Sequence, residues 1–266
     1  MHIAVCINHI PDPEAPAKQF RLDERTGKPL LDRVNRVIGP FDENALEVAL
    51  QLKDAGEARV TALSLGPATN QEALRRALAL RCDAAVHVKE DRASDLDSMA
   101  VGKVLAAALR KLGDVDLVLC GRQVGDWDGG QVGQILAEEL GFSCVTLARQ
   151  IQPVDGEKLR VTREVTGGIV LAEAILPAVV TVTNTPSNQL RIPKVRDAMA
   201  AYKIPITIWG MADLGLGPSE LIGSARVVVR RMFVPETRVR VEMITGDDDQ
   251  QIAERLARRM LDLKVL

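Results

Sequence analysis

The part of the sequence with the clearest chemical meaning is a glycine-rich loop between an apolar run and an amphipathic one. Val115 to Cys120 is mostly apolar, the loop spans Gly121 to Gly130, and Gln131 to Leu140 has helical spacing. Glycines between a strand and a helix let backbone N–H groups approach an anion, and the helix dipole favours negative charge there. The pattern therefore predicts a phosphate cradle, and a glycine-rich turn without a ligand is the alternative.

Neither common nucleotide fingerprint is present in this loop. No G-x-G-x-x-G follows the first apolar run, and no G-x-x-x-x-G-K occurs. The position of the loop still suits a ligand, since open α/β sheets bind ligands outside the carboxyl ends of their strands. Gly39 and Gly66 adjoin other predicted elements at the same edge, and we expect them to complete an adenine pocket.

Residues for covalent or metal chemistry are scarce. The only histidines are His2, His9 and His87, and none has the partners or spacing of a nucleophilic or metal site. The four cysteines form no C-x-x-C pair, which argues against a zinc site or a redox dithiol. Arg163 and Glu164 are neighbours in a predicted strand, so they point to opposite faces. This scarcity favours a carrier or binding module over an enzyme.

The elements that must position the loop alternate between strand and helix. Cys6, Cys120 and Cys144 lie in apolar runs and are expected to pack as small hydrophobes. Asp42 is expected to cap the first helix with its carboxylate. The alternation predicts an α/β fold with a doubly wound, mostly parallel, Rossmann-like sheet. The expected order is strand 3–10, helix 42–54, strand 59–65, helix 70–81, strand 85–88, helix 94–112 as the longest of this half, strand 115–120 and helix 131–140.

Beyond Cys144 the pattern changes. Residues 159–165 and 169–176 flank a Thr-Gly-Gly turn and predict a β-hairpin, and 177–183 predicts a further strand. A smaller hairpin is expected around Thr26-Gly27. We predict one α/β nucleotide-binding domain over 1–235 and a C-terminal arm over 236–266. The arm should contain a helix within 247–266 with Ile252, Leu256, Met260 and Leu263 on one side.

Composition excludes several classes of protein. With 47% hydrophobic and 26% charged residues, the chain has the composition of a globular protein. The formal net charge of -2 provides no basic field for nucleic acid or an anionic membrane surface. The sequence shows neither a basic start followed by a long apolar stretch nor an apolar run long enough to span a bilayer. We therefore expect a cytoplasmic protein that is not integral to a membrane.

Six separated motifs occur in a specific order. In these motifs and their spacing, the sequence resembles the electron transfer flavoprotein beta (small) subunit family over nearly its full length. Besides the glycine-rich loop, the motifs are Val5 to Asp12 (VCINHIPD), Gly39 to Glu47 (GPFDENALE), Leu63 to Ala68 (LSLGPA), Val161 to Gly168 (VTREVTGG) and Leu176 to Thr181 (LPAVVT).

The resemblance implies an electron carrier that forms a heterodimer with a larger alpha subunit. In that family the alpha subunit holds the redox-active FAD, while the beta subunit binds AMP or, in electron-bifurcating members, a second FAD. Electrons pass from dehydrogenases such as acyl-CoA dehydrogenases to a respiratory quinone oxidoreductase or another acceptor. By position, the nucleotide pocket would comprise Cys6, Gly39, Pro40, Phe41, Asp42, Leu65, Gly121, Arg122, Gln123, Val124, Gly125, Asp126, Gly129, Gly130, Gln131 and Val132.

The family's partner-recognition loop falls on residues 190–203, which in relatives docks on the dehydrogenases. Apolar side chains interleaved with cations fit an anchoring patch with a charged rim, and a solvated short helix is the alternative. The residues implied in partner recognition are Arg191, Ile192, Pro193, Val195 and Met199.

The sequence departs from the family pattern around the nucleotide loop. Gly130 and Val132 flank Gln131 where AMP-binding members usually have Asn and Thr. Val132 is like the bifurcating form, whereas Gly129 stands where that form tends to have Thr. AMP and a second FAD therefore both remain open.

Two other functions compete with an electron carrier. One is a small ATP-using adenylating enzyme on the same fold, in which residues 121–130 would hold a pyrophosphate. It needs a cation or carboxylate placed at the α-phosphate, and the sequence offers no convincing set. The other is an interaction protein that binds no nucleotide.

Overall fold

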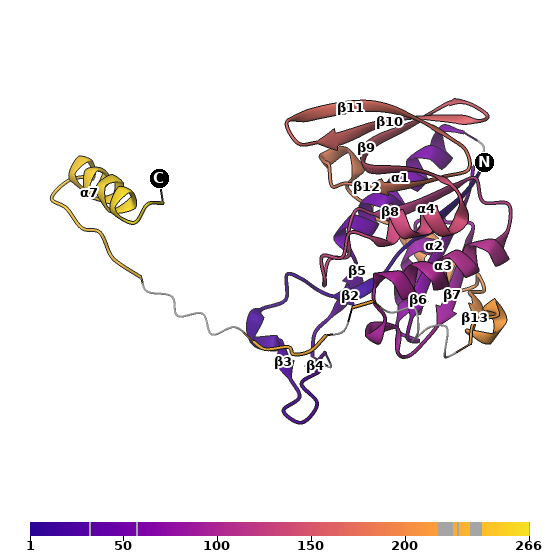
Figure 1. Ribbon diagram of the computed structural model, residues 1–266, viewed down its shortest axis with the longest axis horizontal. Helices are drawn as coiled ribbons and strands as arrows, with labels where there is room; N and C mark the ends of the chain where they lie inside the picture. Colours follow the sequence, from indigo (N-terminus) through magenta and orange to yellow (C-terminus); the bar gives the residue numbers. More distant parts are fainter. Residues whose placement is uncertain (32, 57, 218–225, 228, 235–240, 266) are drawn as a thin grey trace. The chain divides into compact units, whose positions relative to one another are not determined.

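The computed structural model describes the whole chain except residues 32, 57, 218–225, 228, 235–240 and 266 (Figure 1). The chain divides into two compact units, Met1–Met232 and Phe233–Leu266. The first unit contains the sheet and its covering helices, and the described part of the second contains one helix.

The first unit is built on a nine-stranded sheet in the order β11-β10-β9-β12-β8-β1-β6-β7-β13 (Figure 1). Its parallel part consists of β1 (His2–Cys6), β6 (Arg59–Gly66), β7 (Ala84–Lys89), β8 (Leu117–Gly121), β12 (Ala178–Val182) and β13 (Thr207–Trp209). β9 (Ser143–Asp155) runs parallel to β12, while β10 (Lys158–Val165) and β11 (Gly168–Ile175) continue the sheet antiparallel. Every residue of β1 and β12 is buried, as expected for strands covered on both faces.

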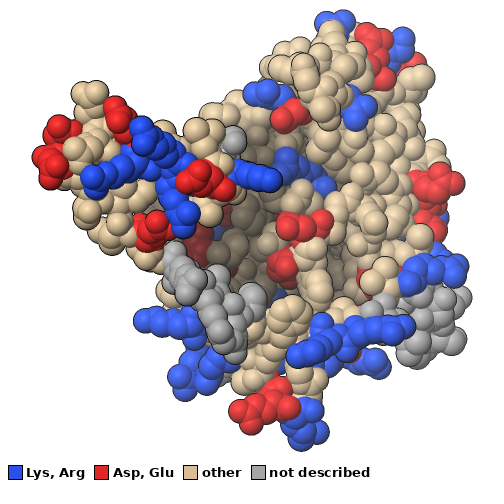
Figure 2. Space-filling model, turned by 60° about the vertical axis from the view of Figure 1, so that its left-hand side comes forward, with Lys and Arg blue, Asp and Glu red and all other residues tan. Residues whose placement is uncertain are grey.

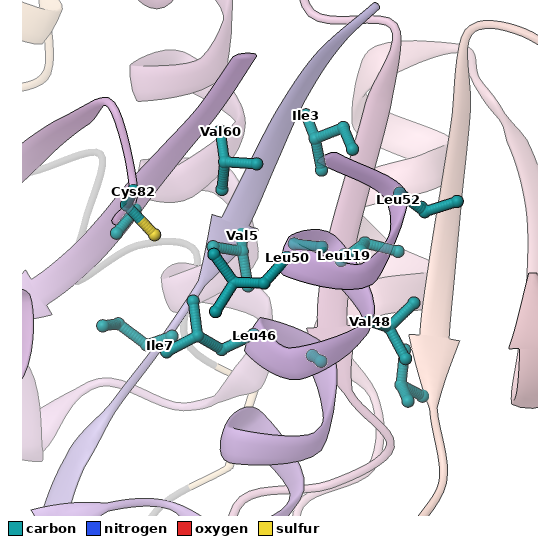
Figure 3. Packing of buried hydrophobic residues seen from close by; sticks show 14 of the residues in the cluster. Ile3, Val5, Ile7, Leu46, Val48, Leu50, Leu52, Val60, Cys82 and Leu119 are labelled. Atoms are coloured by element: carbon teal, nitrogen blue, oxygen red, sulfur yellow. The ribbon is translucent and has the colours of Figure 1, made fainter. Parts of the chain in front are cut away.

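Helices cover both faces of the parallel strands. One core cluster joins α1 (Pro40–Ala55) and α2 (Asn70–Ala79) to the sheet, and the other joins α3 (Ser98–Leu112) and α4 (Val132–Leu140) to it. Figure 3 shows Leu46 and Leu50 of α1 directed toward Val5. Because Leu46 is fully buried, its truncation to Ala should cost roughly 2–5 kcal/mol of stability. This arrangement confirms the predicted doubly wound, mostly parallel α/β fold.

Shorter elements complete the first unit. β2 (His9–Pro11) pairs with β5 (Arg36–Ile38), and β3 (Arg21–Leu22) pairs with β4 (Pro29–Leu30). The β3–β4 hairpin turns at Gly27, whose φ of 65° suits glycine. Among the residues that the structure describes here, the remaining short elements are η1 (Ala17–Gln19), η2 (Ala93–Asp95), η3 (Pro186–Asn188), α5 (Val195–Ala201) and η4 (Ala212–Leu214).

Several local predictions differ from the structure. The expected strand 3–10 is two strands, β1 and β2. The helix expected over 94–112 is not the longest of its half, since α1 has 16 residues and α3 has 15. It begins later because Asp97 caps α3 by accepting the N–H of Ala100. Cys144 is exposed because its neighbour Val145 points into the core, so the expectation that it packs inside was wrong.

The second unit contains α7 (Asp249–Asp262), whose N-terminus is capped by Asp248 accepting the N–H of Gln251. None of the residues described in this unit is buried. Ile252, Leu256 and Met260 lie at helical spacing, as the sequence indicates, and Leu263 follows the last residue of the helix. The helix therefore has no core of its own.

Candidate functional site

The candidate site lies at the carboxyl edge of the parallel strands. β1 pairs with β6 on one side and β8 on the other. From β1 the chain builds the sheet outward through β6 and β7, and β8 begins the other half. The strand order thus reverses between β1 and β8, and such switch points are where open α/β sheets bind ligands. Cys6 ends β1 and Gly121 ends β8, so both predicted site residues lie at this point.

At the switch point the side chain of Asp42, in the first turn of α1, binds the segment after β1 and the end of β8. Its carboxylate accepts the N–H of Asn8 at 2.9 Å and the N–H of Gly121 at 3.2 Å. A Cβ at Gly121 would lie 2.5 Å from Asp42 Oδ1 and 2.8 Å from the carbonyl carbon of Phe41, so only glycine fits there. Asp42 does not cap α1, contrary to the sequence expectation. The N-cap is Gly39, without a side-chain bond, and Pro40 begins the helix.

Burial raises the pKa of the Asp42 carboxyl to about 7. The N–H groups of Asn8 and Gly121 oppose this rise, and the nearby carboxylates of Asp126 and Glu43 add to it. The pKa of Asp126 is itself raised, mainly by burial. The carboxyl at the centre of the junction therefore titrates near neutral pH.

The glycine-rich loop is folded back on itself. Gln123 Nε2 donates to Asp128 Oδ1 at 2.7 Å, and the N–H of Asp128 donates to the Val124 carbonyl at 3.0 Å. The Arg122 guanidinium lies 4.6 Å from the centre of the Phe41 ring. The loop is therefore stacked against the first turn of α1.

The glycines of the loop have different roles. A Cβ at Gly133 would lie 2.3 Å from Thr181 Cγ2, so this glycine lets α4 approach β12. Cβ atoms at Gly129 and Gly130 would lie 3.3 Å from Ser98 Oγ and 3.2 Å from the Arg122 carbonyl oxygen. Within the described chain no side chain caps α4, so its first N–H groups are left for water or an anion.

Two buried polar atoms at this edge have no hydrogen-bond partner among the described residues. They are Arg122 Nε and Asn70 Oδ1. Asn70 begins α2 beside the end of β6, where its Nδ2 donates to Ser64 Oγ and the Leu65 carbonyl. Sequence reasoning missed Asn70 and Asn8 as site residues, although Asn70 begins a predicted helix.

The structure brings most predicted pocket residues together. Gly125 lies against Ile10 and Pro40, because its Cβ would be 2.8 Å from the first and 3.1 Å from the second. Leu65 lies at the buried end of β6, in the strand next to β1. The junction gathers Cys6, Gly39, Pro40, Phe41, Asp42, Gly121, Arg122 and Gly125, while Gln123, Val124, Asp126, Gly129, Gly130, Gln131 and Val132 follow in the adjoining loop and helix start.

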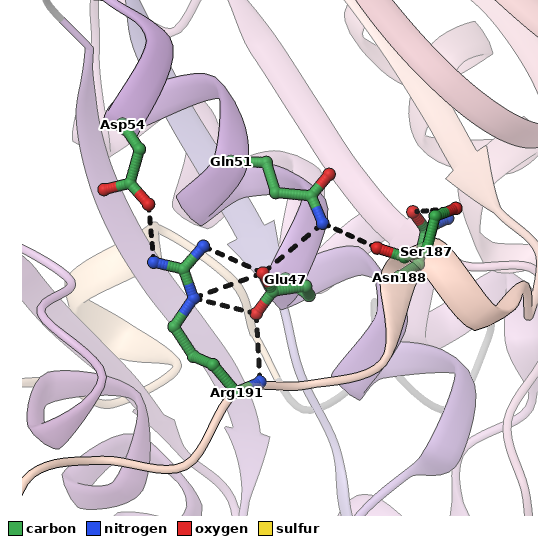
Figure 4. A network of polar contacts seen from close by, with 6 residues as sticks. All are labelled: Glu47, Gln51, Asp54, Ser187, Asn188 and Arg191. Atoms are coloured by element: carbon green, nitrogen blue, oxygen red, sulfur yellow. Dashed lines mark hydrogen bonds and ion pairs between the residues drawn. The ribbon is translucent and has the colours of Figure 1, made fainter.

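The expected recognition segment contains exposed apolar side chains. Ile192 is 90% exposed, Val195 78% and Met199 69%. Val195 and Met199 lie on α5, and Pro193 precedes it. Arg191 differs, because its guanidinium is bound to Glu47 and Asp54 (Figure 4).

Acidic and basic side chains are interspersed on the face shown in Figure 2.

Among the described residues, no group of three or more His, Cys, Asp and Glu could hold a metal ion. None of the helices in the described chain combines the length and the hydrophobicity needed to cross a bilayer.

The fold defines an α/β protein of the doubly wound, Rossmann-like class, with glycine-rich turns at its switch point. The family model for the electron transfer flavoprotein domain matches residues 30–214, which is more than half of the chain. The chain therefore belongs to the electron transfer flavoprotein family.

Three proteins of related sequence align with most or all of this chain. "Caffeyl-CoA reductase-Etf complex subunit CarD" of Acetobacterium woodii is 33% identical over the full length of both chains. "Electron transfer flavoprotein subunit beta" of Megasphaera elsdenii is 31% identical, again over both full lengths. "Protein FixA" of Azorhizobium caulinodans is 33% identical over 90% of this chain and 86% of its own. These matches confirm the resemblance to the beta subunit and an electron-transfer role associated with flavin.

Proposed function

We propose that this chain binds an adenine nucleotide, either AMP or a second FAD, at the switch point between β1 and β8. The chain would act in a heterodimer whose alpha subunit holds the main FAD. It would pass electrons from acyl-CoA or related dehydrogenases to a quinone oxidoreductase or another acceptor. We place this function in the cytoplasm.

The main support for the proposal is the arrangement of residues where Asp42, Gly121 and Arg122 meet. Glycine is required at 121 by close packing, and the uncapped N-terminus of α4 supplies N–H groups that suit a phosphate. Arg122 provides a cation at the end of β8, where its guanidinium lies over the Phe41 ring and 3.3 Å from Thr183 Oγ1. Its buried Nε and Asn70 Oδ1 have no partner among the described residues. Buried polar atoms are normally hydrogen-bonded, so these residues fit a polar ligand. AMP would supply no redox chemistry, whereas a second FAD would supply another electron-carrying group.

Identification of the released nucleotide tests this proposal. The heterodimer would be purified gently and denatured, and the nucleotides released would be measured by mass spectrometry. We expect one FAD per heterodimer and, in addition, one AMP or a second FAD. Release of a single FAD and no other nucleotide would contradict the proposed site and favour an interaction protein.

The adenylating enzyme remains a competitor with a different readout. It predicts that the purified protein releases pyrophosphate when incubated with ATP and an acid substrate. None of the contacts of the described residues given above favours it over a carrier. If the chain is an electron carrier, incubation with ATP should release no pyrophosphate.

A further inference from the structure

Arg191 is bound within the chain by an unusually complete set of contacts (Figure 4). Its Nε lies 3.0 Å from Glu47 Oε2, and its Nη2 lies 2.8 Å from Glu47 Oε1. Its backbone N–H donates to Glu47 Oε2 at 3.1 Å. Its Nη1 lies 2.6 Å from Asp54 Oδ2. A guanidinium held in this way is already paired and is a poor candidate for contact with another protein.

Glu47, whose carboxylate accepts these bonds, is a buried residue. It lies in the middle of α1 and is only 5% exposed. Its side chain also accepts a bond from Gln51 Nε2, which donates in addition to the Ser187 carbonyl at 2.8 Å. Only Glu47 is buried in this ion pair, since the Arg191 side chain is 36% exposed. An ion pair to a buried carboxylate adds little net stability compared with an apolar pair, but it can fix one conformation. The pair therefore sets where residues 187–191 lie on α1.

The exposed apolar segment begins immediately after this attachment. Ile192, the next residue, is 90% exposed, and the segment continues through α5 to Ala201, which is buried. We call residues 192–200 the docking segment.

A second arginine holds the other end of the docking segment. Arg75 of α2 donates through Nη1 to the carbonyls of Ala201 and, at 2.6 Å, Ile204. Its guanidinium also lies 5.7 Å from the centre of the Tyr202 ring. The docking segment is thus attached to α1 at one end and to α2 at the other. Between the two points Ala198 packs against the core, while Ile192, Val195 and Met199 are exposed.

We propose that Arg191 and Arg75 are positioning residues that hold the docking segment in one conformation for a partner protein, and that neither contacts the partner. The inference rests on the proposed docking of this segment on a dehydrogenase. Fixing a segment in its bound conformation removes an ordering cost from association. If loss of one attachment leaves about a tenth of molecules in the correct conformation, the apparent affinity falls about tenfold.

A double-mutant cycle separates positioning from contact. The heterodimer with FAD would be the electron acceptor for an acyl-CoA dehydrogenase, with Glu47→Gln, Arg191→Gln and the double variant compared. If Arg191 only positions the segment, each single variant raises KM for the heterodimer by about tenfold, and the double variant raises it no further. Maximal rate should stay unchanged, because the electron-carrying groups are untouched. If Arg191 contacts the dehydrogenase, Glu47→Gln leaves KM near the wild-type value and Arg191→Gln alone raises it.

Hydrogen exchange supplies a readout that does not depend on the partner. Amides of residues 192–200 should exchange faster in Glu47→Gln, in Arg191→Gln and in Arg75→Gln, which tests the other attachment. Met199→Ser should raise KM without changing exchange, since Met199 is exposed. If Met199→Ser leaves KM unchanged, the proposed docking fails. If it raises KM while the Glu47, Arg191 and Arg75 variants change neither KM nor exchange, the positioning inference is overturned.

The matched control is Asp54→Asn. Asp54 touches the same guanidinium, but its side chain is 60% exposed. Exposed ion pairs contribute little, so we expect less than a twofold change in KM. Circular dichroism would confirm that every variant is folded, and a variant that failed to fold would leave Arg75→Gln as the test of the same inference.

Discussion

Asp42→Asn should remove a large part of the pH dependence of stability. The side chain is 6% exposed and accepts two backbone N–H groups, from Asn8 and Gly121. Burial, its main perturbation, raises the pKa of the carboxyl from its ordinary 3.8 to about 7. Asparagine cannot ionise, so the difference in pH dependence between the two proteins reports the cost of ionising this group. Its NH2 cannot accept a hydrogen bond, so Asp42→Asn also loses one of the two backbone bonds, a loss of stability that does not depend on pH.

The sign of the effect follows from proton binding. Between about pH 4 and pH 7 the folded protein holds a proton on Asp42 that the unfolded chain has lost. The free energy of unfolding contributed by Asp42 therefore falls as the pH rises, and it levels off above the folded pKa. At about 1.4 kcal/mol per pH unit, the difference between the two pKa values corresponds to about 4 kcal/mol.

Urea unfolding at pH 5, 6, 7 and 8 measures this contribution. The wild-type protein should lose about 3 kcal/mol relative to Asp42→Asn between pH 5 and pH 8, with most of the loss below pH 7. Asp91→Asn, at an exposed turn, should follow the wild-type curve. Parallel curves for wild type and Asp42→Asn would show that the buried carboxyl does not titrate as described.

Three further outcomes are expected. Gly130→Val should lower nucleotide retention after dialysis by on the order of a hundredfold, since excluding a phosphate forfeits about two charge-assisted hydrogen bonds of roughly 1.5 kcal/mol each. Gln123→Ala should cost less, and full nucleotide content in folded Gly130→Val would place the pocket elsewhere. The chain expressed without its alpha subunit should carry little flavin, and stoichiometric FAD would identify the second-FAD form. Deleting residues 239–266 should weaken copurification with the alpha subunit, because α7 has no buried residue of its own; unchanged copurification at low concentration would contradict this.

The first half of the fold was predictable because its elements have regular patterns. Ala45, Leu46 and Ala49 recur at helical spacing and are all buried in α1. β9 was not predicted, although it is a 13-residue strand. Arg149, Gln150 and Gln152 interrupt its apolar pattern, because only part of this strand faces the core. Local periodicity fails where one strand passes from the core to the sheet margin.

The candidate site was predictable as a region and not as a set of contacts. The glycine loop after an apolar strand pointed to the switch point between β1 and β8. The bond from the Gly121 N–H to Asp42 joins residues 79 positions apart, and the pair of Arg191 and Glu47 spans 144. No local pattern encodes such pairs, so the sequence suggested a helix cap for Asp42 and a partner contact for Arg191. Asp42 binds Asn8 and Gly121 instead of capping the helix, while the Arg191 guanidinium is bound to Glu47 and its contact with a partner stays a prediction.

The place of β12 in the sheet constrains how the chain folds during synthesis. β12 lies between β8 and β9 although it follows both in the sequence. β7, β6, β1 and β8 can pair once Gly121 has been made, whereas β9, β10 and β11 have no strand to join them to that group until Val182 is made. Chains generally fold from the N-terminus as they leave the ribosome. We therefore expect the parallel group of β7, β6, β1 and β8 to form early. The strands β9, β10 and β11 would join it late, when β12 pairs with β8 on one side and β9 on the other.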